Sequence, residues 1–248
     1  MRHVDPRPRL NDSAVEIFLL GDIDFETCLA LQQRLVYEAG GRRDGQIGLL
    51  LCEHRPLITI GRAGSRSHLH LSQAELTSRQ LEVRWVNRGG GCLLHLPGQL
   101  AIYPIVPLER HSFSVGEYLR RLQAALVAVL ADFGIAGQLH PGTFDIAGRT
   151  GQLVGVGAAV KNWISYYGAY VNVSAASRVF RYIEPEAQRR IGMSSMIAER
   201  QGPVKMAAVR ASVIRHMTDA LGCERYHIYT GHPLLAAPCQ RFYESTAV

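Results

Sequence analysis

The chain has 248 residues, of which 47% are hydrophobic and 19% charged, a balance typical of a folded globular protein and not of a disordered one. Its formal net charge is +6, but only two of its 27 basic residues are lysines, and the arginines are scattered along the chain. This pattern argues against a nucleic-acid-binding surface and is compatible with docking to an acidic partner protein.

Hydropathy and cysteine spacing exclude further classes. No apolar run approaches the roughly 20 residues that a membrane-spanning helix needs, and the amino terminus has no hydrophobic signal core, so we expect a cytoplasmic protein. The five cysteines are odd in number, and no two of them stand as Cys-x-x-Cys. That argues against a disulfide framework or a zinc site, and we expect reduced thiols, no metal and no cofactor.

The first part of the chain reads as an arm followed by strands and one helix. Residues 1–14 contain two prolines and several charges and are predicted to form a flexible arm. A short strand is predicted at 15–20, and apolar residues at helical spacing predict a helix from about residue 25 to Gly40-Gly41. The continuous apolar run at 47–52 predicts a strand buried on both faces.

Three further helices are marked by the residues at their ends. The sequence Ser72-Gln-Ala-Glu75 has the form of a capping box and predicts a short helix. Ser114 and Glu117 form a second capping box, ahead of a long amphipathic helix that Gly134 ends. Pro203 is predicted to open a last helix, which ends at Gly222. Its inward residues are expected to be Val204, Ala208, Ala211, Ile214, Met217 and Leu221.

Residues 153–160 and 164–173 are predicted to form paired strands. Glycines at 155, 157 and 168 within them indicate close approach of a ligand or of another backbone. Together the elements predict one α+β domain at 15–222, a mixed β-sheet flanked by helices, followed by a C-terminal tail at 223–248.

Residues 86–104 contain three consecutive glycines, Gly89 to Gly91, between Arg88 and His95. A backbone without β-carbons can take positive φ angles and contact a ligand directly. A plain turn between two strands is the alternative, but the spacing does not fit a hairpin. The glycines also match neither G-x-G-x-x-G nor G-x-x-x-x-G-K-[ST], which argues against a nucleotide-binding loop of those types.

This loop resembles the signature of the octanoyltransferases, through Arg88-Gly89-Gly90 and through His95-x-Pro97-Gly98-Gln99-Leu100. The similarity extends to residues 49–62, 131–135 and 168–173. The resemblance covers about residues 15 to 222 and implies the fold of the lipoate and biotin protein ligase catalytic domain.

The resemblance also implies an activity. Octanoyltransferases move an octanoyl or lipoyl group from acyl carrier protein to a lysine of a lipoyl domain, in a 2-oxoacid dehydrogenase or the glycine cleavage protein. The implied partners are octanoyl-acyl carrier protein and lipoyl domains. By the same resemblance, the acyl tunnel and the thioester end would be lined by Arg88, Gly89, Gly90, Gly91, Cys92, Leu93, Leu94 and His95, by Gly155, Val156 and Gly157, and by Gly168, Ala169 and Tyr170.

The catalytic positions of the family are occupied by other residue types in this chain. The resemblance places the family's lysine at Gln152 and its cysteine nucleophile at Glu186, directly after Pro185. Glutamine carries no charge that could lower the pKa of a thiol, and no cysteine lies between residues 92 and 223. A second octanoyltransferase family places its cysteine where this chain has Thr143. The nearest lysine, Lys161, is nine residues from position 152, an odd offset that puts it on the opposite face of a regular strand.

Four hypotheses therefore stand beside a misassigned site in an ordinary octanoyltransferase. Cys92, three residues before His95, could replace the nucleophile, or it could simply pack beneath the loop. Glu186 could act as general base for direct aminolysis of a bound thioester. The protein could bind an acyl group or carrier protein without catalysis. It could also be an ATP-dependent lipoate or biotin ligase, which the missing lysine argues against.

Overall fold

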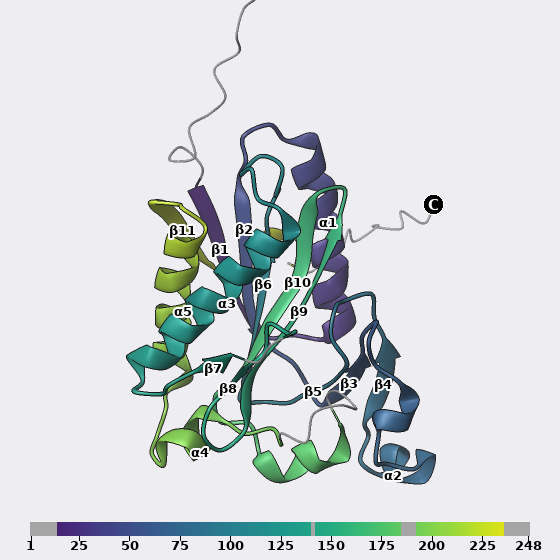
Figure 1. Ribbon diagram of the computed structural model, residues 1–248. Coiled ribbons are helices and arrows are strands. Elements are labelled where there is room, and N and C mark those ends of the chain that lie inside the picture. The colour runs from purple at the N-terminus through teal and green to yellow at the C-terminus, as the bar shows by residue number, and fades with distance from the viewer. Residues whose placement is uncertain (1–13, 140–141, 185–191, 236–248) are drawn as a thin grey trace, which may run out of the picture.

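The structure is a computed structural model that describes residues 14–139, 142–184 and 192–235 (Figure 1). Its strands are β1 (Ala14–Asp22), β2 (Ile47–Glu53), β3 (Leu57–Ile60), β4 (Glu82–Trp85), β5 (Cys92–His95), β6 (Gln99–Ile105), β7 (Gln138–Leu139), β8 (Ile146–Ala147), β9 (Gln152–Lys161), β10 (Ile164–Asn172) and β11 (Arg225–Thr230). Its α-helices are α1 (Phe25–Gly41), α2 (Gln73–Ser78), α3 (Val115–Asp132), α4 (Met196–Arg200) and α5 (Met206–Ala220), and its 3₁₀ helices are η2 (Arg66–His68), η3 (Ser177–Tyr182) and η4 (Pro233–Leu235).

The strands form two sheets. The larger has the order β11-β1-β2-β6-β10-β9-β8-β7, and the smaller has the order β4-β3-β5. In the larger sheet β1 pairs in parallel with β2 and β11, whereas its other pairs are antiparallel. The predicted mixed sheet flanked by helices is therefore present.

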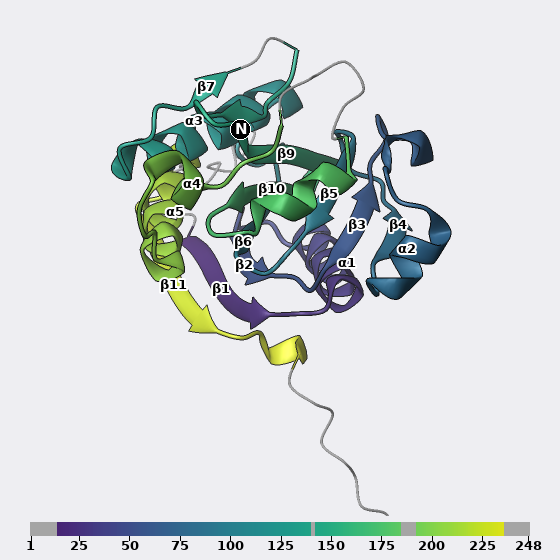
Figure 2. The ribbon, with the colours of Figure 1, turned by 90° about the horizontal axis from the view of Figure 1, so that it is seen from below.

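Helices cover both faces of the larger sheet, with α3 and α5 on one face and α1 on the other (Figure 2). Strand β2 shows why its sequence is apolar throughout: Leu49 and Leu51 join the core beneath α3 and α5, while Leu50 and Cys52 pack on the α1 side. Alternate residues of a strand face opposite sides of the sheet, so a strand covered on both sides needs no polar position.

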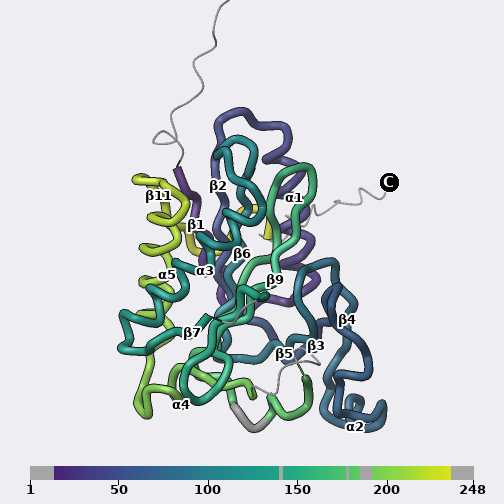
Figure 3. Tube along the Cα trace, in the orientation of Figure 1, coloured from purple at the N-terminus to yellow at the C-terminus, as the bar shows by residue number. Residues whose placement is uncertain are grey.

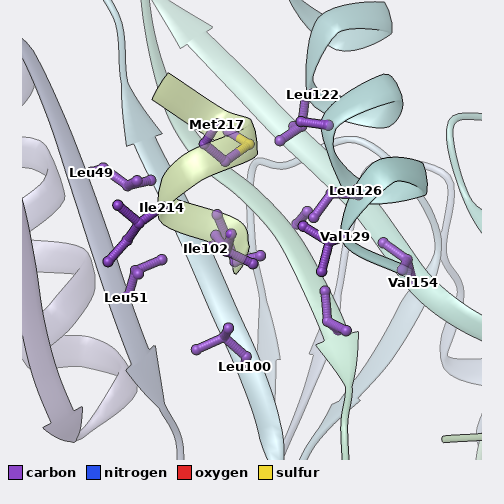
Figure 4. Close-up of a cluster of buried hydrophobic side chains, with 14 of the residues drawn as sticks. Leu49, Leu51, Leu100, Ile102, Leu122, Leu126, Val129, Val154, Ile214 and Met217 are labelled. Carbon is purple, nitrogen blue, oxygen red and sulfur yellow. The ribbon is translucent and has the colours of Figure 1, made fainter. Parts of the chain in front are cut away.

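The core between the sheet and the helix pair is built from residues at helical spacing (Figure 4). Helix α3 contributes Leu122, Leu126 and Val129, and α5 contributes Ile214 and Met217. These positions, three or four residues apart, place their side chains on one helix face. The long amphipathic helix expected from the sequence is thus the cover of this core.

The capping predictions are correct for α2 and half correct for α3. Ser72 and Glu75 satisfy each other's backbone amides in both directions. Ser114 accepts a hydrogen bond from the backbone N–H of Glu117 at 3.1 Å, but the Glu117 carboxylate pairs with Arg121 at 2.8 Å. Arginine one turn later on the same face competes for that carboxylate, so the second box is closed in one direction only.

The inward face of the last helix agrees with the prediction in part, since Val204, Ile214, Met217 and Leu221 are buried. Helix α5 begins at Met206, not at Pro203, and its inward stripe runs through Val209, Val213 and Met217. Ala208 and Ala211 are exposed. The larger side chains face the core because they bury more apolar area than alanine does.

The sheet extends beyond the predicted domain limit at residue 222. Strand β11 pairs with β1 in parallel, with Ile17 opposite Ile228, so the first part of the expected tail, 223–248, belongs to the sheet. The expected arm at 1–14 lies outside the described residues except for Ala14, which starts β1. Within the described ranges, no helix is long and apolar enough to cross a membrane.

Candidate functional site

The glycine loop, which connects β4 to β5, lies directly on β9 (Figure 3 traces these strands). The backbone N–H of Gly89 donates to the carbonyl oxygen of Ala158 at 2.9 Å, and Gly90 has a φ of +78°. A β-carbon on Gly157 would lie 2.7 Å from the carbonyl oxygen of Gly89, and one on Gly61 would lie 2.5 Å from that of Gly90. Such contacts are too short for any side chain, so glycine at 157 lets β9 approach the loop, and glycine at 61 lets the segment after β3 approach it as well.

A hollow, called here the first hollow, lies between this loop and β9. It is lined by Arg88, Gly90, Gly91, Cys92, Leu93, Asp145, Gln152, Gly155, Val156, Gly157, Tyr170 and Met193. Its free volume is about 30 Å³, room for about two water molecules. The loop, strands β5, β9 and β10 and two separate segments thus line one small space.

Ten of the residues expected from the sequence come together in this hollow. They are Arg88, Gly90, Gly91, Cys92, Leu93, Gln152, Gly155, Val156, Gly157 and Tyr170. Leu94, His95, Gly168 and Ala169 do not line it, and Gly89 and Thr143 line a neighbouring space. Gly168 instead makes room for another backbone, because a β-carbon there would collide with the carbonyl oxygen of Ile102. Glu186 lies outside the described residues.

Asp145 and Met193 line the hollow without having been predicted. Asp145 accepts a hydrogen bond from the backbone N–H of Val156 at 2.8 Å, at an irregularity in the pairing of β8 with β9. Met193 forms an isolated bridge with Gln152. Neither belongs to a sequence motif, and only the fold brings them to the site.

Arg88 supplies a buried positive charge. It is 3% exposed, and it donates to Thr59 Oγ1 at 2.8 Å, to the carbonyl oxygen of Thr59 at 3.1 Å and to that of Gly89 at 3.0 Å. Its Nε has no hydrogen-bond partner among the described residues. Burial lowers the pKa of Arg88 from its ordinary value, but a guanidinium stays charged in proteins.

His95 sits behind Arg88. Its Nε2 lies 3.0 Å from Thr59 Oγ1. Its Nδ1 has no hydrogen-bond partner among the described residues. Burial, reinforced by the charges of His54 and Arg88, holds the pKa of His95 well below its ordinary value. His95 is therefore a neutral member of the buried network and does not reach the hollow.

Comparison with known proteins identifies this arrangement. Residues 24–218 match the lipoyl protein ligase A/B catalytic domain. The octanoyltransferase of Geotalea uraniireducens (strain Rf4) is 35% identical over 201 residues, covering 80% of this chain and 89% of that protein. The octanoyltransferase of Roseiflexus sp. (strain RS-1) is 35% identical over 213 residues, covering 84% and 88%. The chain belongs to the octanoyltransferase family.

Solved structures agree on the fold. A bipartite lipoate protein ligase from Thermoplasma acidophilum superposes with a TM-score of 0.69 at 14% identity, covering 89% of this chain and 88% of that one. A lipoate-protein ligase A bound with ATP gives 0.69 at 14% identity, covering 90% of each chain. The predicted lipoate and biotin ligase type of catalytic domain is confirmed.

Cys92, one of the candidate nucleophiles, lies in a buried environment. Cys92 is 4% exposed, and its Sγ donates to the carbonyl oxygen of Ser65 at 3.4 Å. Burial raises the pKa of the Cys92 thiol, although the nearby Arg88 acts in the opposite direction. A thiol in that state is protonated near neutral pH and is a weak nucleophile.

Gln152 occupies the start of β9 at the edge of the hollow. Its backbone N–H donates to the carbonyl oxygen of Gly192, and its own carbonyl accepts from Ser194, both at 2.9 Å. Its side-chain Nε2 donates to the carbonyl oxygen of Val154 at 3.4 Å. Lys161 is at the other end of the same strand, nine residues away and so about 30 Å distant at the rise of an extended chain. Lys161 does not line the hollow.

One group of possible metal ligands lies elsewhere, beneath α1. Ligand atoms of Cys28, Cys52 and His54 are within 4.8 Å of one another. His54 Nδ1 donates to the carbonyl oxygen of Ile23 at 2.8 Å, and Nε2 lies 2.7 Å from the hydroxyl oxygen of Tyr103. Burial raises the pKa of the Cys52 thiol well above its ordinary value. With both imidazole nitrogens bonded, His54 serves as the structural residue that its place beside a buried strand suggests.

Proposed function

We propose that this protein transfers an octanoyl or lipoyl group from a thioester of acyl carrier protein to a lysine side chain of a lipoyl domain. The supporting observation is the first hollow, where residues expected at the acyl tunnel converge on the glycine loop. Relatives that are 35% identical are octanoyltransferases, so the proposal extends their activity to this chain.

The acyl chain would occupy the apolar side of the hollow, between Leu93, Val156, Tyr170 and Met193. Each methylene buried there contributes about 0.8 kcal/mol. The free volume of about 30 Å³ is smaller than an eight-carbon chain, so binding requires side chains to move. Met193 is suited to that, because a methionine side chain has three rotatable bonds and adapts to irregular space.

The thioester carbonyl would lie against Arg88. A buried guanidinium stabilises negative charge that develops on an oxygen more strongly than the same group does in water. Arg88 is already oriented by Thr59 and Gly89. It therefore needs little reorganisation to stabilise the tetrahedral intermediate.

Transfer would proceed directly from the thioester to the amine, without an acyl-enzyme. The protonated, buried state of the Cys92 thiol argues against a covalent intermediate on that residue. In the direct reaction the amine nitrogen bonds to the carbonyl carbon, the carbon–sulfur bond breaks, and the carrier thiol leaves with one proton. Glu186 remains a hypothesis for the general base.

A second candidate function is acyl or carrier-protein binding without catalysis. The specific observation in its favour is Gln152, an uncharged amide where the resemblance places the family's lysine. An ATP-dependent ligase is the weaker alternative, because neither of the two lysines, Lys161 and Lys205, lines the first hollow.

The test is mass spectrometry of the intact proteins after incubation with octanoyl-acyl carrier protein and an apo lipoyl domain, without ATP. We expect the lipoyl domain to gain one octanoyl group and the protein itself to gain none. A stable adduct on the protein would contradict the direct reaction. Octanoyl-carrier binding without any transfer would establish the binding function instead, and transfer of free octanoate that requires ATP would establish a ligase.

A further inference from the structure

A second hollow adjoins the first on the other side of the glycine loop. It has a free volume of about 480 Å³, far more than the first hollow. Its walls include Val115 and Leu119 from the start of α3 and Val156 from β9. Arg62 also lines it, and its guanidinium donates to the backbone carbonyl oxygen of Asn87 at 3.3 Å and to its side-chain oxygen at 3.2 Å.

The two hollows meet at three residues. Gly90, Asp145 and Val156 line both of them. Asp145 is fixed at this junction, because one of its carboxylate oxygens accepts a hydrogen bond from the backbone N–H of Val156 at 2.8 Å. Anything that passes along the second hollow toward the first therefore reaches this carboxylate.

The chemistry along the second hollow selects the kind of group that fits. The hollow combines apolar side chains, among them Val115, Leu119 and Val156, with the carboxylate of Asp145, and Arg62 also lines it. A lysine side chain combines four methylenes with an ammonium group. The methylenes would lie along Val115 and Leu119, and the ammonium would lie at the Asp145 carboxylate, at the junction with the first hollow.

We propose that the second hollow admits the side chain of the acceptor lysine and that Asp145 binds its ammonium group beside the thioester. This inference rests on the proposed function, since it assigns the acceptor to a route separate from that of the acyl chain. Each substrate then arrives from its own side of the glycine loop, and the two reacting atoms meet at Gly90.

Asp145 would also set the protonation state of the acceptor. The ammonium gives one proton to the carboxylate, from which it passes to solvent, and the neutral amine attacks the thioester carbonyl. The carbon–nitrogen bond forms, the carbon–sulfur bond breaks, and the second proton goes to the departing carrier thiolate. The products are the amide, the carrier thiol and one released proton.

The matched variants are Asp145→Asn and Asp219→Asn. Asparagine at 145 keeps a side-chain oxygen that can accept from Val156 and removes the negative charge. Asp219 is an exposed aspartate on α5, so the same chemical change there controls for net charge. Transfer from octanoyl-acyl carrier protein is measured with two acceptors, the apo lipoyl domain and hydroxylamine, which is an uncharged nucleophile at neutral pH.

We expect Asp145→Asn to raise the KM for the lipoyl domain about tenfold to a hundredfold, the range of one charge-assisted hydrogen bond. The KM for the octanoyl donor and the rate with hydroxylamine should stay within about twofold, and Asp219→Asn should match the wild type. An unchanged KM for the lipoyl domain, or equal losses with both acceptors, would overturn the role of Asp145 while leaving the proposed function standing. Absence of transfer to either acceptor by the wild type would overturn both.

Discussion

Two groups of residues line the first hollow, and they depend on the sequence in different ways. The loop side, from Arg88 to Leu93, and the β9 glycines contribute backbone, apolar surface and one buried cation. The other group, called here the entrance side, is Gln152 at the start of β9, where the octanoyltransferase resemblance places a lysine. The binding surface on the loop side depends on the fold as a whole, whereas the chemistry of transfer depends on one or two side chains. A chain can therefore keep the binding surface while its catalytic side chains change.

The comparison is tested most strongly at Arg88, the charged residue on the loop side. We expect Arg88→Met to lower the transfer rate about a hundredfold to a thousandfold, the effect of removing one preorganised oxyanion donor. Methionine fills much of the same volume, so the loop should remain packed. The measurement is initial rate with saturating octanoyl-acyl carrier protein. Arg84→Met, on the exposed strand β4, is the control, and an equal loss there would remove the special role of Arg88.

The entrance side can be tested by restoring the residues that the resemblance expects. We predict that the double variant Gln152→Lys with Glu186→Cys forms an acyl-enzyme with octanoyl-acyl carrier protein, because a lysine near a thiol favours the reactive thiolate. Glu186→Cys alone should form less, since Gln152 offers no charge. Intact-mass measurement reads both. No adduct in the double variant would mean that positions 152 and 186 do not correspond to the family's catalytic pair.

The sequence predicted those elements whose burial imposes a regular spacing of apolar residues. The apolar run of β2 and the stripe of α3 are read from spacing, because burial on both faces or on one helix face leaves a regular trace. The glycine-rich segments were found for the same reason, since a β-carbon at Gly157 would collide with the Gly89 carbonyl oxygen.

The position of Asp145 and the pairing of β11 are not indicated by any local sequence pattern. Asp145 lies at the junction of the hollows, next to the irregular pairing of β8 with β9. Strand β11 is exposed throughout, yet it pairs with β1. Tertiary contact decides such positions, and a single sequence does not record it.

Two glycines of β9 differ in their surroundings: Gly157 packs closely against the glycine loop, whereas Gly155 has space beside it. A β-carbon on Gly157 would lie 2.7 Å from the Gly89 carbonyl oxygen, whereas one on Gly155 would have no neighbour closer than 3.6 Å. We expect Gly157→Ala to lower the free energy of unfolding by about 1–3 kcal/mol, as overpacking does, and Gly155→Ala to leave it within about 0.5 kcal/mol. Urea denaturation measures both. Equal stability of the two variants would contradict the direct packing of the loop on β9.

Cys92 belongs to the loop side, and we expect its replacement to have the smallest effect. In Cys92→Ala the buried thiol and its hydrogen bond to Ser65 are lost, which should cost about 1 kcal/mol of stability. The transfer rate should change by less than about twofold, because direct transfer uses no thiolate. If the wild type instead forms an acyl-enzyme and Cys92→Ala abolishes it, Cys92 is the nucleophile and the direct reaction is wrong. An adduct that persists in the variant assigns the acyl group to another residue, and peptide mapping would then identify it.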